Sequence, residues 1–163
     1  MKYLLSLIIF LCCWTGSLSA LEIRLGPVVG WKTQAIEAVL EGPTDWFEEG
    51  IRPEVGVEVG LGPLGTQVLF PLGLTWESYG EIGLSWGVSL HGLVGTALTP
   101  TAFIWGAEGE LRSEWSWNPG IALGLSVGVR YAGAHWDVPL HLVVEFHLAD
   151  EHSLEPAGEK DED

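Results

Sequence analysis

Charged and imidazole side chains recur at every second position in several stretches of this 163-residue sequence. Glu108 and Glu110 form one such pair, and His141, Glu145 and His147 form another set near the end. Side chains two or four residues apart lie on one face of an extended chain. An imidazole beside carboxylates is able to ligate a divalent metal, but most histidines on a polar face bond to neighbouring side chains. We therefore predict no metal and no cofactor, and keep His141, Glu145 and His147 as the candidate ligands.

A possible nucleophile and a possible base also lie on the same face of one predicted strand. Ser85, Ser89 and His91 alternate there with apolar residues, and Glu81 has the same phase. Catalysis would need these groups within hydrogen-bonding reach of one another, and such sets are defined by geometry across strands. The sequence has no zinc helix motif and no phosphate-binding loop, and we expect no nucleophile elbow. We predict no catalytic residue and no enzyme, with an enzyme that modifies envelope lipids as the alternative.

Apolar side chains alternate with small or polar ones across most of the sequence after residue 20. Ile82, Leu84, Trp86 and Val88, for example, alternate with glycine, serine and glutamate. Such alternation over ten or more residues is typical of β-strands with two different faces, and turn-forming residues separate the stretches. We predict eight strands, at residues 21–31, 34–42, 53–62, 66–77, 80–92, 101–112, 119–131 and 135–148.

Two features of these strands stay open at this stage. Ala35–Leu40 could equally form a short helix that ends at Gly42-Pro43, which would leave seven strands, whereas bacterial barrels have an even number. Pro27, Pro71 and Pro139 lie inside predicted strands, where proline removes a hydrogen-bond donor. Each proline marks either a bulge or a misplaced strand end.

The two faces of the predicted strands differ in size as well as in polarity. One face carries large apolar residues, and the other carries Gly, Ser, Glu, Arg and His. Glycine weakens a strand on a solvated outer face, whereas small and charged residues fit a narrow lumen and large apolar ones fit lipid. Strands of this length also suffice to cross the hydrocarbon layer when tilted. The predicted fold class is an all-β, antiparallel, up-and-down transmembrane β-barrel of eight strands.

Aromatic residues lie near the ends of the predicted strands. Girdles of aromatic side chains mark the two membrane interfaces of transmembrane barrels. The alternative is that these side chains belong to the core of an ordinary soluble domain. We predict a girdle made of Trp31, Trp76, Trp105, Trp115, Tyr131, Trp136 and Phe146.

Charged residues fall on the inward phase of the predicted barrel. Burying an unpaired charge costs several kcal/mol, so we expect carboxylates to surround Arg24 and Arg130. The predicted lumen charge network consists of these two arginines with Glu58, Glu108 and Glu145. Side chains just fill an eight-stranded interior, which favours a plug over a pathway for cations. Because acids outnumber bases, some carboxylates are expected to be protonated, hydrated or bound to cations.

The two ends of the chain differ in composition from its body. Lys2 precedes an apolar run at residues 3–14, and small residues follow, which is the layout of a cleavable secretory signal. The last residues are acidic and include proline and glycine, as in solvated disordered tails. We predict a signal peptide at 1–19, a β-barrel domain at 20–148 and an acidic disordered tail at 149–163. Both cysteines lie in the predicted signal, so disulfides contribute nothing to the barrel.

The formal net charge is −15, from 22 acidic and 7 basic residues. Such a chain cannot neutralise a phosphate backbone, which excludes nucleic acid as a partner. Part of the acidic charge lies in the segment Lys32–Arg52, around Trp46. A loop there would offer an acidic and aromatic contact to a partner or to calcium, although most acidic runs are simply solvated.

The predicted signal, the amphipathic strands and the small size together resemble the small outer-membrane β-barrels of bacteria with a Gram-negative-type envelope. The pattern points to no specific family. The resemblance implies an outer-membrane location, contact with the lipid bilayer and recognition by the outer-membrane assembly machinery, which binds a last strand ending on an aromatic residue. Leu142, Val144 and Phe146 resemble that strand, but here the acidic tail follows it.

The resemblance also implies a structural or surface-interaction role with a narrow, charge-plugged lumen, and it leaves any extracellular partner unidentified. Two alternatives stay open. The first is a small, porin-like passive channel for apolar or cationic solutes, which conductance would reveal. The second is a soluble secreted β-barrel that binds an apolar ligand, which would be recovered without detergent.

Overall fold

β-Strands make up most of the described chain, which comprises residues 20–42, 50–79, 83–118 and 120–149 of a computed structural model. The predicted signal peptide and the predicted tail after Ala149 lie outside these residues. Among the described residues, no helix is long and apolar enough to cross a membrane. The strands are β1 (Ala20–Val29), β2 (Gln34–Glu41), β3 (Ile51–Gly62), β4 (Gly65–Tyr79), β5 (Leu84–Leu98), β6 (Thr101–Asn118), β7 (Ile121–Ala132), β8 (His135–Asp137) and β9 (Leu140–Ala149).

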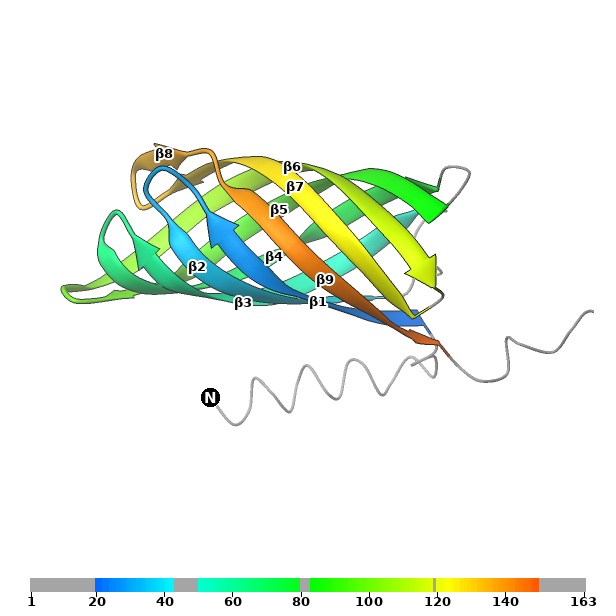
Figure 1. The fold of residues 1–163 in the computed structure, drawn as a ribbon. Helices are drawn as coiled ribbons and strands as arrows, with labels where there is room; N and C mark the ends of the chain where they lie inside the picture. Colours follow the sequence, from blue (N-terminus) through cyan, green and yellow to red (C-terminus); the bar gives the residue numbers. More distant parts are fainter. Residues whose placement is uncertain (1–19, 43–49, 80–82, 119, 150–163) are drawn as a thin grey trace, which may run out of the picture.

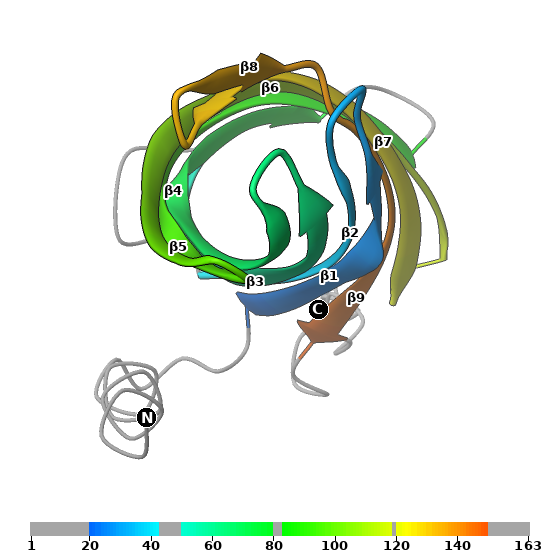
Figure 2. The ribbon, with the colours of Figure 1, turned by 90° about the vertical axis from the view of Figure 1, so that its left-hand side faces the viewer.

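The strands form one closed antiparallel barrel (Figure 1, Figure 2). Each strand from β1 to β6 pairs with the next one, and β9 pairs with both β7 and β1, which closes the ring. The short β8 pairs with the last residues of β7, so β8 and β9 together occupy the eighth position. The predicted fold class, an eight-stranded antiparallel barrel, is confirmed. Closure leaves no open sheet edge, as a membrane-spanning sheet requires.

The barrel has two distinct ends. Ala20 pairs with Ala149, so both ends of the described chain lie at one end of the barrel, which we call the termini end (right in Figure 1). The opposite end, which we call the turn end, carries the connections that leave β1, β3, β5 and β7. Each of these connections has four residues or fewer. The turn end is therefore compact.

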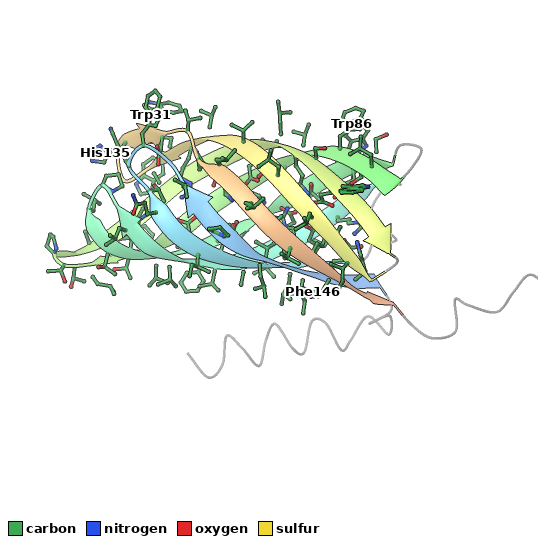
Figure 3. All side chains as sticks on the ribbon, in the orientation of Figure 1. Trp31, Trp86, His135 and Phe146 are labelled. Atoms are coloured by element: carbon green, nitrogen blue, oxygen red, sulfur yellow. The ribbon has the colours of Figure 1, made fainter. Side chains whose placement is uncertain are left out.

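Side chains alternate between the outside and the lumen along each strand, as predicted (Figure 3). On β7, Leu125 and Val129 are 51% and 55% exposed, whereas Ser126 and Arg130 are 5% and 2% exposed. Every glutamate, aspartate and arginine of the described residues is 8% exposed or less. The outer surface of the strands is thus apolar, and contact with lipid is more favourable for it than contact with water.

Exposed aromatic side chains contact one another near both ends of the barrel. Near the turn end, the ring centroids of Trp105 and Tyr131 are 6.2 Å apart, and those of Tyr131 and Trp136 are 5.0 Å apart. Near the termini end, Trp76 meets Trp86 edge to face at 5.3 Å. Offset contacts of this kind add stability beyond the area that they bury.

The aromatic side chains define two levels. Figure 3 places Trp31 at the turn end and Phe146 at the termini end, and Trp105 and Trp115 lie near opposite ends of β6. Ten residues separate the latter two, or about 33 Å along a strand, and a tilt of about 40° leaves a height of about 25 Å. This height matches the apolar band of a transmembrane barrel. Trp86, which the predicted girdle left out, belongs to the termini-end level.

The second predicted strand is present, and the helical alternative for it is wrong. Gln34–Glu41 pairs with both neighbours as β2. Within it, Glu37 and Glu41 face the lumen and are 5% and 0% exposed. The segment Lys32–Arg52 is therefore not one acidic loop, because its first acids alternate inward on a strand. Residues 43–49, which include Trp46, lie outside the described residues.

Prolines inside the strands interrupt the ladder on one side. Pro27 pairs with Ile36 of β2, but the pairing of β1 with β9 skips the positions at Pro27. Pro71 likewise pairs with Leu93 of β5, while the pairing of β3 with β4 skips it. Pro139 lies in the break between β8 and β9. A missing donor is tolerated at such positions because no ladder bond depends on it.

The apolar outer face gives a first test. Val127 pairs with Leu111 of β6, close to the midpoint between the two aromatic levels. Val127→Arg should lower the free energy of unfolding by about 2–4 kcal/mol, because arginine is costly at the bilayer midplane. The matched control Leu61→Arg, beside the β3–β4 turn, should cost about 1 kcal/mol or less. Denaturant unfolding in phospholipid vesicles measures both values, and equal losses would contradict a depth-dependent lipid contact.

Candidate functional site in the barrel lumen

The lumen holds nearly all the charge of the described barrel. Eleven carboxyl groups and four guanidinium groups are 8% exposed or less, and His91 and His141 are buried among them. An eight-stranded interior has room for little besides side chains, so these groups lie in close contact with one another. The arginines are Arg24, Arg52, Arg112 and Arg130, and the acids are Glu22, Glu37, Glu41, Glu54, Glu58, Glu77, Glu108, Glu110, Glu114, Asp137 and Glu145.

Arg130 organises the part of the network near the turn end. Its Nη1 donates to Glu58 Oε1 at 2.8 Å and its Nη2 to Glu58 Oε2 at 2.6 Å, a two-pronged pairing. Glu108 Oε2 lies 2.8 Å from the same Nη2. His141 lies 3.0 Å from Glu37 and 3.3 Å from Glu108. The structure thus brings together three of the five residues of the predicted network.

Arg24 lies farther toward the termini end, with different partners from those predicted. Its Nε is 2.9 Å from Glu41 Oε1, and its Nη2 is 3.4 Å from Glu54 Oε1. His91 also contacts Glu54 and lies 3.4 Å from Glu110 Oε1. Glu41 of β2 and Glu54 of β3 therefore surround Arg24. The predicted partners were Glu58, Glu108 and Glu145.

Arg112 is the centre of the network, and sequence reasoning missed it. The predicted strand ended at residue 112, but β6 continues to Asn118. The sequence did contain a signal for Arg112. It continues the inward-facing series of Glu108 and Glu110 at every second position, and Glu114 extends that series. The carboxylates around Arg112 are Glu114 in direct contact, Glu77 at 2.6 Å, Glu41 and Glu54 at 2.8 Å and Glu145 at 3.6 Å.

A smaller group of charges lies at the termini end. Arg52 contacts Glu22, and its Nε lies 3.7 Å from Glu77. His147 Nδ1 lies 3.0 Å from Glu22 Oε1 and 3.7 Å from Glu145 Oε1. The His147 side chain is 24% exposed, so solvent reaches the network from this end.

Apolar side chains close the turn end. Leu69, Ala97 and Ile104 form a cluster that is 1% exposed or less, and Leu64 of the β3–β4 turn packs against it. Figure 2, which looks into this end, shows the β3–β4 hairpin inside the outline of the ring. The cavity that remains between this hairpin and Arg130 measures about 10 Å³, the size of a single water molecule. Leu64, Leu69 and Ile104 therefore occupy much of the lumen at the turn end.

The serine and histidine candidates for catalysis do not form a set. Ser89 shares a 2.8 Å hydrogen bond with Thr75, whereas His91 contacts Glu54 and Glu110. Glu81 lies outside the described residues. Gly-x-Ser-x-Gly spacings occur at residues 83–87 and 124–128. Their serines lie within β5 and β7, so neither is the strand-to-helix elbow of a hydrolase.

The three candidate metal ligands do not all lie together. His141 contacts Glu37 and Glu108, whereas Glu145 and His147 lie together at the termini end. The structure instead shows two groups of three ligand-type residues among the described ones. One consists of Glu22, Glu145 and His147, and the other of His91, Glu108 and Glu110.

Comparison with known proteins identifies the class of fold. No protein-family model matches the chain, and a search of curated proteins finds no match. The chain is similar to a barrel from "De novo design of transmembrane beta-barrels", with a TM-score of 0.62 and 10% identity over 79% of this chain and 95% of that one. It is similar also to the N-terminal β-barrel domain of Pseudomonas aeruginosa OprF, with a TM-score of 0.64 and 12% identity over 79% and 97%. At these identities the likeness shows the fold alone, a small transmembrane β-barrel.

The paired charges at Arg130 give a second test. Arg130→Met should lower the free energy of unfolding by about 3–5 kcal/mol, because it leaves buried carboxylates without their cation. The double variant Arg130→Met/Glu58→Met should recover much of this loss, since it removes the unpaired charge of Glu58 and leaves Glu108 beside His141. Unfolding in detergent micelles measures both. A loss below about 1 kcal/mol in the single variant would show that the network is not needed for stability.

Proposed function

We propose that this protein is an outer-membrane β-barrel with a structural or surface-interaction role and a lumen closed by its own side chains. The observation that carries the proposal is the inverted distribution of polarity. The apolar side chains of the strands face outward and the carboxylates and arginines face inward. An outer membrane is the bilayer in which bacterial barrels of this kind occur, and the predicted export signal agrees with it.

The closed lumen supports a structural role over a passive channel. Ion pairs fill the middle of the barrel, and Leu64, Leu69 and Ile104 close the turn end. A cation on its way through would have to displace arginines, and an apolar solute would have to cross buried charges. The passive channel stays the alternative, and conductance distinguishes the two.

The same lumen argues against a soluble barrel that binds an apolar ligand. Such a ligand needs an interior lined mainly by apolar side chains. The large apolar side chains of the strands lie outside instead; Leu90, Leu111 and Leu142, for instance, are 67%, 63% and 53% exposed. A soluble protein seldom exposes so continuous an apolar surface.

The surface-interaction part of the proposed role belongs to the termini end. The turns of the opposite end are short and leave little to contact a partner. β2 ends, β3 begins and β9 ends at the termini end of the barrel. The sequence between β2 and β3 contains Asp45, Trp46 and Glu48, and the sequence after Ala149 is acidic. We propose a role without catalysis. Ser89 hydrogen-bonds to Thr75 and Ser126 to Glu110, whereas His91 contacts Glu54 and Glu110.

Membrane fractionation tests the proposed location. The full chain, expressed in a bacterium with an outer membrane, should be found in the outer-membrane fraction and should need detergent for extraction. A closed barrel stays folded in unboiled detergent samples, so its mobility on a gel should change on boiling. Recovery as a soluble protein with no change in mobility would contradict the proposal.

Conductance in a planar bilayer tests the closed lumen. The wild-type protein should give no stepwise conductance if, as proposed, the ion pairs around Arg112 and Arg130 plug its interior. Arg112→Ala/Leu69→Ala, which removes the central arginine and part of the apolar cluster, should give brief openings if it folds, as judged by gel mobility. Steady cation-selective steps in the wild type would instead support the passive channel.

A further inference from the structure

Three ligand-type side chains meet at the termini end of the lumen. The pairing of β1 with β9 sets Glu22 opposite His147, and Glu145 lies two residues before His147 on the same face. His147 Nδ1 is 3.0 Å from Glu22 Oε1 and 3.7 Å from Glu145 Oε1. One ligand atom from each residue lies within 4.8 Å of the other two. Three donors are therefore gathered by adjacent strands without any change in the backbone.

The charges of these residues are incompletely balanced. Glu145 Oε2 has no hydrogen-bond partner among the described residues although its side chain is 1% exposed, and the nearest arginine nitrogen, Arg112 Nη2, is 3.6 Å away. Glu22 is held by Arg52 through its other oxygen, Oε2. Two buried carboxylates this close cannot both remain ionised without a proton or a cation between them.

The balance of the whole lumen points the same way. Its eleven described carboxyl groups face four arginines. Even with His91, His141 and His147 all protonated, the carboxyl groups would outnumber the cations by four. A cation bound beside Glu145, whose nearest arginine nitrogen is 3.6 Å away, would relieve part of this excess.

We propose that Glu22, Glu145 and His147 bind a divalent transition-metal ion of the Zn²⁺ type. A mixed set of one imidazole nitrogen and two carboxylate oxygens suits zinc, which binds both at about 2.0–2.2 Å. Tetrahedral ligands at that distance lie about 3.3 Å from one another, and the two separations from His147 Nδ1, 3.0 Å and 3.7 Å, bracket this value. Solvent completes the coordination, since His147 is 24% exposed.

The second group of ligand-type residues does not have these properties. His91 contacts both Glu54 and Glu110, and Glu110 Oε2 accepts a hydrogen bond from Ser126 at 2.8 Å. Glu108 is bound by Arg130 and His141. The imidazole and the two carboxylates of this second group therefore already have partners. We assign the group to the structural charge network. The metal site is confined to the termini end.

Zinc titration of the folded protein tests the site. The full chain in detergent micelles, freed of metal with a chelator, should bind about one Zn²⁺ by calorimetry. His147→Gln and Glu145→Gln should each weaken binding at least about tenfold, the loss expected from disturbing a zinc site. His135→Gln, which changes a histidine at the opposite end, should bind as the wild type does. No saturable binding, or equal weakening by His135→Gln and His147→Gln, would overturn the proposal.

A measurement on the wild type does not depend on the folding of any variant. X-ray absorption at the zinc edge, on protein loaded with one equivalent, should show nitrogen and oxygen neighbours with outer scattering from a single imidazole. Two imidazoles or none would overturn the assignment to Glu22, Glu145 and His147. Gel mobility of unboiled samples shows which variants are folded and can be compared.

Discussion

The separation of an apolar outside from a charged inside, by a wall one strand thick, is the constraint on which this structure depends. Adjacent residues such as Leu125 and Ser126 face opposite environments, so a shift of register by one residue would reverse every strand. Ring closure between β1 and β9 makes the constraint possible. It pairs the backbone groups that lipid could not satisfy.

The charge network follows from that separation. Once lipid faces the apolar side chains, the ionisable groups have only the lumen to occupy, and a narrow lumen forces them into contact. Arg112 and Arg130 each gather carboxylates from several strands. These contacts cross-link strands that are far apart in the ring. At the termini end, the buried Glu145 lies beside His147, whose side chain is partly exposed to solvent.

The strands and their faces could be predicted from sequence because a period of two is a local property, as residues 121–131 show. The partners of each charge could not, because they depend on register across the ring. Arg24 pairs with Glu41 and Glu54 of the next two strands, a choice that no spacing within β1 encodes. The closure of the turn end by Leu64 was equally hidden, since a leucine in a tight turn looks unremarkable until the β3–β4 hairpin folds inward.

Site-by-site spin labelling along β7 is the most direct measurement of the central claim. The only cysteines of the sequence are Cys12 and Cys13. With both replaced by serine, single cysteines at 123–129 can be labelled cleanly in the protein folded into vesicles. Labels at 123, 125, 127 and 129 should collide readily with oxygen dissolved in lipid, and labels at 124, 126 and 128 should be shielded from oxygen and from a water-soluble nickel complex. Loss of this alternation, or high nickel accessibility at the odd-numbered positions, would contradict a lipid-facing apolar surface around a closed, charged lumen.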